Sequence, residues 1–408
     1  AVLVLKQCTK KYPMLYYYVA YYEEKMGEDE AAKKSLEKAE SCAFDYCFPN
    51  KLDDIAVLTF AIENGCKKKA PYYLGNLFYD KLQWKKSVEL WEMSEKADDT
   101  FSIVHRNLAL AYYNKMGDSK AAKRELEKAF SLNRKDARIF LELDQLYKKL
   151  GYSFKERLAK YDEDPSLAES RDDLYIEYIT LMNMCGEYER AYRCIMGRRF
   201  HPWEGGEGKI TTQYTISLLE MAKQCLASEK YEQAEKLLKK ALVYPENLGE
   251  GKLEGTKDNH LFYHLGLALE AQGKHDEAKT CFETATIGTD EPAGAMYYND
   301  QPADMILYQG LAFEKLGKTR EAKSRFYRLI DYGEQHLNDE GKIEYFAVSL
   351  PDFLIFDEDY TKKNRAHCCY LMALGNIGLQ NREKAAEFLN EALEIEPSHM
   401  MATLYQKQ

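Results

Sequence analysis

The sequence contains few turn-forming residues. Glycine and proline, at 23 and 10 of 408 residues, make up about 8% of the chain, where roughly 12% is usual for a globular protein. An all-β fold needs many turns rich in Gly and Pro, so this depletion argues against one. An apolar content of 45%, with 32 tyrosines, excludes a disordered chain. The composition therefore favours a large, mostly helical protein.

Two further absences exclude classes of partner. No run of about 18 apolar residues occurs, so we expect no segment that spans a membrane. Acidic residues outnumber basic ones, 67 to 57, which disfavours nucleic acid because its affinity depends on clustered Lys and Arg. Much of the excess is local: the segment 331–359 holds nine acidic residues and only one basic residue, Lys342. This segment is interpreted as a solvated insertion or a functional acidic patch.

The ten cysteines include no Cys-x-x-Cys pair, so the spacing typical of a zinc site is missing. Several lie at apolar helical positions, and we interpret all ten as reduced thiols of a cytoplasmic protein. We expect neither a metal nor a cofactor. The chain begins at Ala1 and shows no signal-peptide layout, so we expect a piece of a longer or a proteolysed protein.

One pattern of small and large residues recurs along the chain. A small residue is followed after 12 positions by Ala or Ser, after four more by a large apolar residue, and after three more by another small residue. The copies begin at Ala20, Gly75, Ala109, Asp144, Ile179, Ala222, Gly266, Gly310 and Ala373, some of them imperfect. Such spacing predicts pairs of antiparallel helices that cross closely where the small residues lie. Each pair leaves an apolar side open, so neighbouring pairs must stack.

This pattern resembles the tetratricopeptide repeat family over almost the whole chain. The resemblance implies an all-α, right-handed superhelical solenoid of about nine helix pairs. Proline supports the assignment, because all ten prolines lie outside the predicted helix interiors, where each would cost about 3 kcal/mol.

The spacing of the copies divides the array. The copies from Gly75 to Ile179 are 34 or 35 residues apart, whereas those from Ile179 to Gly310 are 43 or 44 apart. We therefore predict near-ordinary repeats in 1–196, apart from an insertion at 41–69, and repeats with long inter-repeat insertions in 197–408, as one continuous array. Because long loops in a compact array usually have a function, we expect the binding surface in 197–408.

The insertions share a composition. The first, 201–209, reads HPWEGGEGK, the second, 244–252, reads YPENLGEGK, and the third, 291–302, reads EPAGAMYYNDQP. Carboxylates and amides beside Trp and Tyr form a typical sugar-binding set, and glycine allows close backbone approach. The same residues could instead cap helices, because Glu at a helix start interacts favourably with the helix dipole. The final Gly-Lys is no phosphate loop, since neither a preceding strand nor a Gly-Lys-Ser/Thr ending is present.

With the later segments 330–336 and 346–353, these insertions look like the repeat half of a bacterial family. Its members join an uncharacterised β-sandwich domain, similar to galactose mutarotases and carbohydrate-active enzymes, to a tetratricopeptide array. The likeness covers residues 200–408 and implies a carbohydrate-related context. The β-sandwich half, with any catalytic group in it, is absent from this sequence.

A second candidate surface follows from the register of the repeats. In the tetratricopeptide family the first helix of each pair lines a concave groove, and this places matching His-Tyr-Leu triplets there, at 260, 263, 267 and at 367, 370, 374. His260 and His264 have metal-compatible spacing, but position 261 is Leu where a hydrolase motif needs Glu, so we expect one groove-facing and one packed histidine.

The candidate binding residues are His201, Trp203, Glu204, Glu207, Asn247, Glu250, Asn299 and Asp300 on the loops, and His260, Tyr263, His367 and Tyr370 in the groove. The favoured function is a non-catalytic scaffold for a protein or companion domain, with carbohydrate as a further possible ligand. One alternative is a groove that binds peptides. The other is part of a glycosidase site built from the loop carboxylates at 204, 207, 246 and 250.

Overall fold

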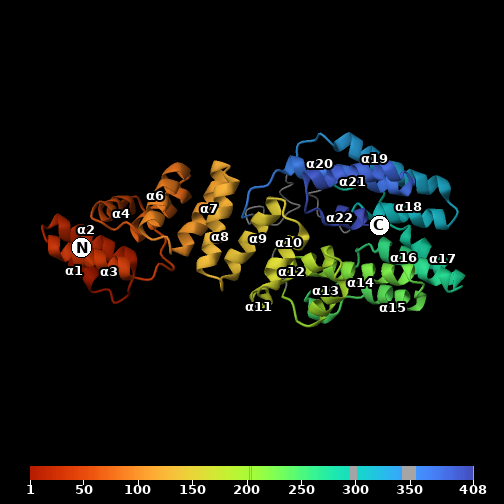
Figure 1. The fold of residues 1–408 in the computed structure, drawn as a ribbon, viewed down its shortest axis with the longest axis horizontal. Helices are drawn as coiled ribbons and strands as arrows, with labels where there is room; N and C mark the ends of the chain where they lie inside the picture. Colours follow the sequence, from red (N-terminus) through yellow and green to blue (C-terminus); the bar gives the residue numbers. More distant parts are fainter. Residues whose placement is uncertain (202, 204, 295–300, 342–354, 408) are drawn as a thin grey trace. The chain divides into compact units, whose positions relative to one another are not determined.

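The computed structural model describes residues 1–201, 203, 205–294, 301–341 and 355–407. Within these residues the secondary structure is entirely helical, with 22 α-helices and one short 3₁₀ helix (Figure 1). The predicted all-α class is therefore confirmed. The chain divides into two compact units, Ala1–Leu146 and Tyr147–Gln408. This division differs from the boundary at 196 and 197 that loop lengths suggested, which stays a prediction about repeat type.

The helices of the first unit are α1 (Val2–Lys6), α2 (Pro13–Lys25), α3 (Asp29–Ser41), α4 (Leu52–Glu63), α5 (Lys69–Asp80), α6 (Trp84–Ala97), α7 (Ser102–Met116) and α8 (Ser119–Leu132). Helix α9 (Ala137–Lys149) spans the division. In chain order the helix–turn–helix pairs are α2–α3, α5–α6, α7–α8 and α9–α10. The insertion expected at 41–69 contains a helix, α4, that packs against α2 and α5.

The helices of the second unit are α10 (Phe154–Asp162), α11 (Pro165–Glu169), α12 (Asp172–Met184), α13 (Tyr188–Met196), α14 (Lys209–Ala227), α15 (Tyr231–Ala241), η1 (Glu246–Leu248), α16 (Asn259–Ala271), α17 (His275–Ala285), α18 (Met305–Lys315), α19 (Thr319–His336), α20 (Tyr360–Gly378), α21 (Arg382–Ile395) and α22 (Met400–Gln406). Five pairs, from α12–α13 to α20–α21, follow each other, and α22 comes after the last. With the four earlier pairs, the described residues form nine.

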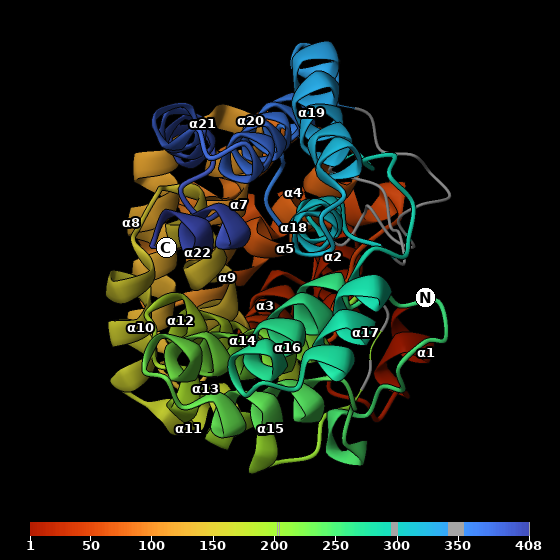
Figure 2. The ribbon, with the colours of Figure 1, turned by 90° about the vertical axis from the view of Figure 1, so that its right-hand side faces the viewer.

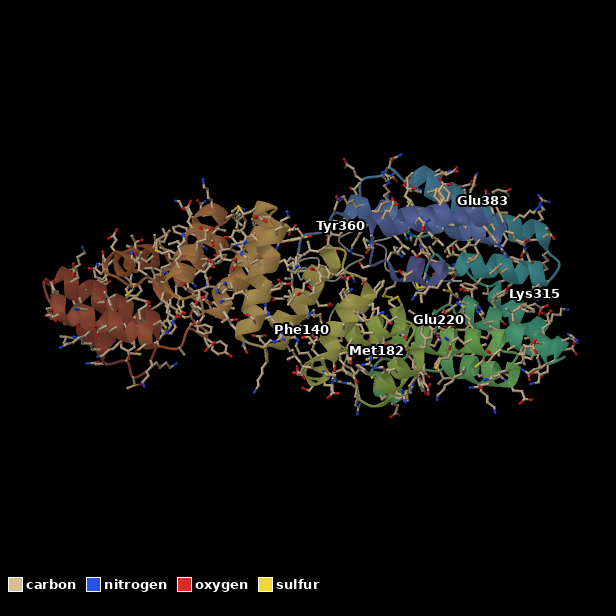
Figure 3. All side chains as sticks on the ribbon, in the orientation of Figure 1. Phe140, Met182, Glu220, Lys315, Tyr360 and Glu383 are labelled. Carbon is tan, nitrogen blue, oxygen red and sulfur yellow. The ribbon has the colours of Figure 1, made fainter. Side chains whose placement is uncertain are left out.

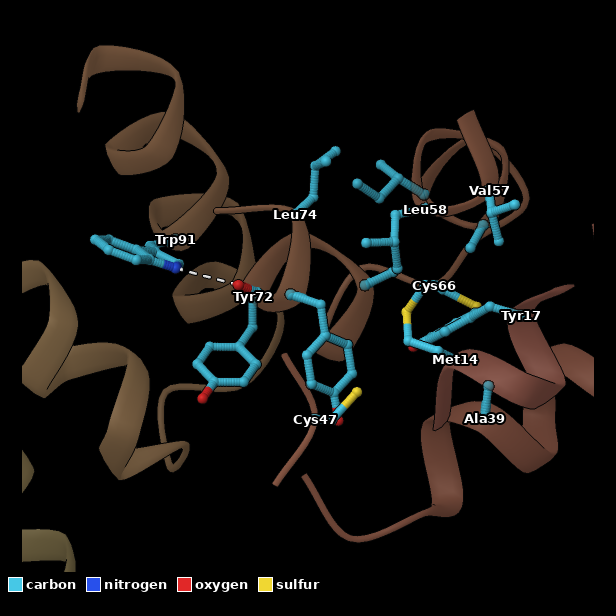
Figure 4. Close-up of a cluster of buried hydrophobic side chains, with 14 of the residues drawn as sticks. Met14, Tyr17, Ala39, Cys47, Val57, Leu58, Cys66, Tyr72, Leu74 and Trp91 are labelled. Atoms are coloured by element: carbon cyan, nitrogen blue, oxygen red, sulfur yellow. Dashed lines mark hydrogen bonds between the residues drawn. The ribbon is translucent and has the colours of Figure 1, made fainter. Parts of the chain in front are cut away.

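The small residues of the sequence pattern lie where helices cross. A Cβ added at Gly75 would lie 2.5 Å from the indole nitrogen of Trp91, and one at Gly266 would lie 2.5 Å from Phe282. The Trp91 indole N–H donates to the carbonyl oxygen of Tyr72 at 3.2 Å, which fixes the ring in the core of the first unit (Figure 4). The large residue therefore fills the space that the missing side chain leaves.

Each of the nine described pairs turns through one residue in the left-handed conformation. Six turns use glycine, at 27, 117, 151, 186, 273 and 317, because glycine adopts a positive φ without strain. The other three use Leu82, Glu229 and Gln380, with φ near +60°. The turn geometry is thus the same whether or not the sequence supplies glycine.

The prolines agree with the predicted helix boundaries. Pro13, Pro71 and Pro165 lie in the first turn of α2, α5 and α11, where a backbone N–H has no partner within the helix. The prolines at 49, 245, 292, 302 and 397 lie between helices, and those at 202 and 351 lie outside the described residues. No described proline interrupts a helix.

Candidate functional site

The second insertion contacts the end of α13 and the residues that lead into the first insertion. The N–H of Phe200 donates to the carbonyl oxygen of Asn247 at 2.8 Å. The side-chain amide of Asn247 donates to the carbonyl oxygens of Ile195 and Arg198, at 2.8 and 3.0 Å. These carbonyl groups lie in the last turn of α13 and just after it, where the helix provides no further N–H groups to bond them. The Asn247 side chain therefore joins the second insertion to the end of α13.

Glu250 also has a structural contact. Its Oε2 accepts a hydrogen bond of 2.9 Å from the N–H of Gly208, the residue that precedes α14. A carboxylate here satisfies a free N–H group and interacts favourably with the positive end of the helix. This is the capping role that the sequence left open as the alternative to ligand binding.

Trp203 and its neighbours form the outer part of the first insertion. The Trp203 ring is half-buried and lies so close to Gly206 that no side chain fits there, while Nζ of Lys209 lies 5.7 Å from the ring centroid. His201 is exposed, at 77% of its side chain, with Nδ1 at 3.2 Å from Asp172, and Glu207 is exposed as well. Glu204 lies outside the described residues.

Large apolar side chains are exposed along the same edge. Val243, Leu253 and Ile287 have 66%, 60% and 59% of their surface accessible. Val243 and Ile287 occupy equivalent positions, each two residues after the last small residue of its repeat. Lys252, which precedes Leu253, donates to the carbonyl oxygen of Leu242, which precedes Val243, at 3.0 Å. The sequence pattern contained this signal, but the prediction considered only polar and aromatic loop residues.

The third insertion is attached to the helices on either side. The Gln301 side chain exchanges two hydrogen bonds with the backbone of Thr289, at 2.9 and 2.6 Å. Nε2 of His367, on α20, lies 2.9 Å from the carbonyl oxygen of Ala293 and must carry the hydrogen. Burial lowers the pKa of His367 to about 4, so this ring is neutral at physiological pH. Asn299 and Asp300 lie outside the described residues.

The histidines of α16 lie against α18. The rings of His260, Tyr263 and His264 are all within 6.0 Å of the Tyr308 ring, measured between centroids. His264 is buried, and its Nδ1 donates to the carbonyl oxygen of His260 at 2.7 Å. His260 is half-buried, and its Nδ1 is enclosed without a hydrogen-bond partner. Burial lowers the pKa of His260 to about 3 and that of His264 to about 4.

A buried acidic and phenolic cluster lies next to these rings. Asp304, only 6% exposed, accepts a long hydrogen bond of 3.4 Å from the Tyr370 hydroxyl, and burial raises its pKa to about 6. The Tyr308 hydroxyl accepts from Tyr405 at 2.7 Å. Burial raises the pKa of Tyr308. The charges of Asp304 and of Glu220, which lies on α14 (Figure 3), raise this pKa further. These groups belong to α14, α18, α20 and α22, so they gather on one inner face.

The C-terminal helix α22 occupies this inner face, which the sequence did not predict. Tyr370, expected to line a groove, is 4% exposed and packs against the tilted rings of His399 and Tyr405, with centroids 4.9 and 6.0 Å apart. The available signal was the segment MMATLYQ directly after Pro397, whose apolar residues need cover. Of the sequence-predicted groove residues, Tyr370 therefore lies beneath the chain's own end.

One further cluster has the residue types of a metal site, in the first unit. Glu95, His105 and Glu125 present ligand atoms within 4.8 Å of one another. However, Nδ1 of His105 lies 2.7 Å from Glu125 and its Nε2 lies 2.8 Å from the carbonyl oxygen of Asp99. Burial alone would lower the pKa of His105, but these hydrogen bonds raise it. A ring that donates from both nitrogens has no lone pair for a metal, so this is a buried ion pair.

The loop carboxylates do not resemble a glycosidase pair. A general acid of such an enzyme needs an apolar environment that keeps it protonated. Glu207 and Glu246 are exposed, and Glu250 accepts from a helix N-terminus. Glu204 lies outside the described residues.

Comparison with known families and structures identifies the repeats. A tetratricopeptide repeat model matches residues 107–136, 260–286 and 366–399, and a second one matches 304–332. These segments correspond to helix pairs of the fold, so the chain contains tetratricopeptide repeats. Proteins with such repeats are generally non-enzymatic scaffolds for protein interaction, which is consistent with the expectation that this chain is not an enzyme. The resemblance to the carbohydrate-related β-sandwich family stays a prediction.

Three solved structures are similar at low sequence identity. YrrB, described as a tetratricopeptide repeat protein with an unusual peptide-binding site, is 19% identical over 63% of this chain and 100% of its own, with a TM-score of 0.22. A tetratricopeptide repeat protein from Parabacteroides merdae is 15% identical, over 76% of this chain and 98% of its own length, with a TM-score of 0.28. A chain of the Naa15/Naa10 complex bound to HypK-THB is 14% identical, over 99% of this chain and 56% of its own length, with a TM-score of 0.35. Such values say nothing about what this chain binds.

No helix among the described residues is both long enough and apolar enough to cross a membrane. All ten cysteines are unpaired. The cytoplasmic location expected from the sequence stays a prediction.

Proposed function

We propose that the chain is a non-catalytic scaffold that binds a protein or companion domain along the edge formed by its insertions. The recurrence of exposed Val243 and Ile287 at equivalent positions of adjacent repeats carries this proposal. Large apolar side chains that recur on one edge are typical of an interface core, whereas isolated ones are common on any surface. Leu253 and the Trp203 ring extend the same edge.

The loop residues that the sequence selected differ in their contacts, which supports different roles for them in this proposal. Asn247 and Glu250 hold the two insertions to α13 and α14, so their replacement would disturb the edge indirectly. His201 and Glu207 are exposed and can form a polar rim around the apolar residues. A partner would thus bury Val243, Leu253 and Ile287 and contact His201 and Glu207 at its border.

The candidate partner is the carbohydrate-related β-sandwich domain that the sequence resemblance names. The test is the affinity between this chain and that domain, produced as separate proteins. The double change Val243→Asp and Ile287→Asp should weaken binding at least 10-fold, because two charges would enter the contact. Leu82→Asp is the matched control, since Leu82 is equally exposed, at 67%, but belongs to the first unit. Unchanged affinity of the double variant would contradict the proposal.

A carbohydrate ligand on the same edge has its own readout. The half-buried Trp203 ring lies beside exposed Glu207, and a sugar stacked on such a ring changes its fluorescence. We expect oligosaccharides of the partner's substrate class to change the emission of the wild-type chain and to leave that of Trp203→Phe unchanged. An identical response from both proteins would assign the change to Trp84 or Trp91.

Peptide binding in the groove remains the second candidate, because aromatic and histidine side chains gather on the inner face. It predicts that changing His260 or Tyr263 weakens binding of a partner while Val243→Asp does not. The two functions are therefore separable by the same assay.

A further inference from the structure

The C-terminal helix α22 lies across the inner face of the second unit. Figures 1 and 2 both show it between α20–α21 on one side and α12–α14 on the other. It contacts α21, which precedes it, and also α12, more than 200 residues earlier in the chain. A helix that only covered the end of an array would contact the last pair alone. Helix α22 therefore packs on the inner face as well as on the last pair, through its buried residues Ala402, Leu404 and Tyr405.

Two adjacent side chains anchor α22. Leu404, 4% exposed, packs in a cluster with Met184 of α12 and Ile216 of α14. Tyr405, 7% exposed, packs against Tyr370 of α20 and donates its hydroxyl to Tyr308 of α18 at 2.7 Å. The helix therefore contacts the first helices of four different pairs through one Leu-Tyr dipeptide.

The ends of α22 also contact the inner face or the preceding turn. Nδ1 of His399 accepts from the N–H of Ala402 at 3.1 Å and so caps the helix. Nζ of Lys407 donates to the carbonyl oxygen of Met184, at the C-terminal end of α12. A basic group at that end of a helix is favoured by the helix dipole. Ala402, fully buried, allows the close approach of the first turn.

Helix α22 has only seven residues, and a helix of this length is not stable by itself in water. It is therefore helical because of its contacts with the inner face. The connection to α21 is short, with Pro397 in the turn, so α22 is held near its site at a high effective concentration. A segment that is bound by side-chain contacts and held by a short tether can be exchanged for a similar segment.

We propose that α22 is a displaceable internal ligand, and that the inner face binds a short helical segment of a partner protein with the same chemistry. The segment would carry a small residue, then Leu-Tyr two positions later, then a basic residue two positions after the tyrosine. This inference rests on the second candidate function, peptide binding in the groove, and adds the occupant. It is independent of the loop-edge function, because it shares no residue with Val243, Leu253 or Ile287. Failure of either proposal leaves the other intact.

The tether determines what binding should look like. A partner must compete with α22, whose effective concentration is of millimolar order for so short a connection. Removing α22 should therefore raise the apparent affinity for a free peptide about 10- to 100-fold. The inner face also loses its apolar cover when α22 leaves, which favours exchange for another occupant over an empty face.

The test uses the chain's own segment as the probe. A fluorescent peptide of residues 397–408 is titrated with the full chain and with a chain that ends at residue 396, whose fold is checked by circular dichroism. We expect binding to the shortened chain that is at least 10-fold tighter than binding to the full chain. A Tyr405→Ala peptide should lose at least 10-fold in affinity. A Gln406→Ala peptide loses only an exposed hydrogen bond to Asn390 and should lose much less.

A second variant keeps the test valid if the shortened chain does not fold. Leu404→Ala in the full chain weakens the contact of α22 without removing it, and the wild-type peptide should then bind more tightly than to the wild-type chain. Tyr308→Phe should lower peptide affinity several-fold, because the hydroxyl partner of Tyr405 is lost. Equal peptide binding by the full, shortened and Leu404→Ala chains would overturn the proposal. So would a concentration-dependent dimer that exchanges α22, since a second copy would then be the occupant.

Discussion

The two units of this chain consist of similar helix pairs but differ in the contacts of their terminal helices, α1 and α22. In the first unit the main helix contacts run between neighbours, or next neighbours, along the chain, and the main contact of α1 is with α2. In the second unit α22 contacts both the last pair and α12. The same unit has a second long-range contact, an ion pair of 2.6 Å between Lys149 and Glu358, which are 209 residues apart in the sequence. An open array gains stability from each neighbouring interface in turn, whereas a linked one depends on all its pairs together. We therefore expect the second unit to unfold more cooperatively than the first, although both consist of similar helix pairs.

The largest effect should come from removing a core side chain in each unit. Trp91→Ala and Phe326→Ala each delete a buried ring, and each should lower the free energy of unfolding by about 3–5 kcal/mol. Hydrogen exchange should show loss of protection around α5–α8 for Trp91→Ala. For Phe326→Ala the loss should extend to α12, because α22 transmits it. If the loss stays within α18–α21, the second unit behaves as an open array.

The next effect concerns the ends of the chain. Leu404→Ala empties part of the cluster with Met184 and Ile216 and should cost about 2–4 kcal/mol in urea unfolding. Leu3→Ala, on α1, changes a side chain that is 81% exposed and should cost less than about 0.5 kcal/mol. Similar values for both variants would show that α22 is as peripheral as α1.

The pH dependence of stability should have opposite signs in the two units. His105, in the first unit, has a raised pKa, so its contribution is complete below pH 6.5 and is lost as pH rises through the higher, folded-state pKa. Burial lowers the pKa of His264 to about 4, so its contribution is complete above pH 6.5 and is lost as pH falls toward 4. In the second unit, His260, His367 and His399 act like His264, and Asp304, with a pKa raised to about 6, opposes them.

Urea unfolding at pH 7.5 and 5.5 measures this contrast. His264→Gln should reduce the loss of stability on acidification, with a slope of up to about 1.4 kcal/mol per pH unit below pH 6.5. His105→Gln should instead remove a gain on acidification. A change of the pH dependence in the same direction for both variants would contradict the opposite signs expected for the two units.

The smallest effect concerns the turns that lack glycine. Leu82→Gly in the first unit and Gln380→Gly in the second relieve a left-handed conformation, and each should raise the free energy of unfolding by roughly 0.5–1 kcal/mol. Gly27→Ala, at φ +76° and in open space, is the reverse change and should lower it by a similar amount. A stabilisation in one unit alone would show that the turns are less alike than their dihedral angles.

The sequence predicted the local packing well because the small and large residues that meet at helix crossings recur at a fixed spacing. Gly75 with Trp91 and Gly266 with Phe282 meet as the pattern required. It did not predict the helices α4, α11 and α22, which lie outside the period. The position of α22 depends on contacts between residues more than 200 apart, such as Lys407 with Met184, and spacing in one chain does not reveal these.

The candidate site was predicted less completely for a related reason. Asn247 and Glu250 have polar side chains that suit a ligand, yet the ends of α13 and the start of α14 offer them backbone partners first. A sequence shows which groups can bind but not which neighbours already satisfy them. The exposed Val243 and Ile287 became visible only when burial was known for the whole edge.

The link between α22 and α12 has a consequence for how many repeats this unit can hold. An open array can gain or lose a pair at its end and remain folded. Here an added or deleted pair between α12 and α21 would shift α22 relative to Met184 and Ile216 and separate Tyr405 from Tyr308. We therefore expect that the number of pairs between α12 and the seven-residue helix α22 cannot change without loss of these contacts.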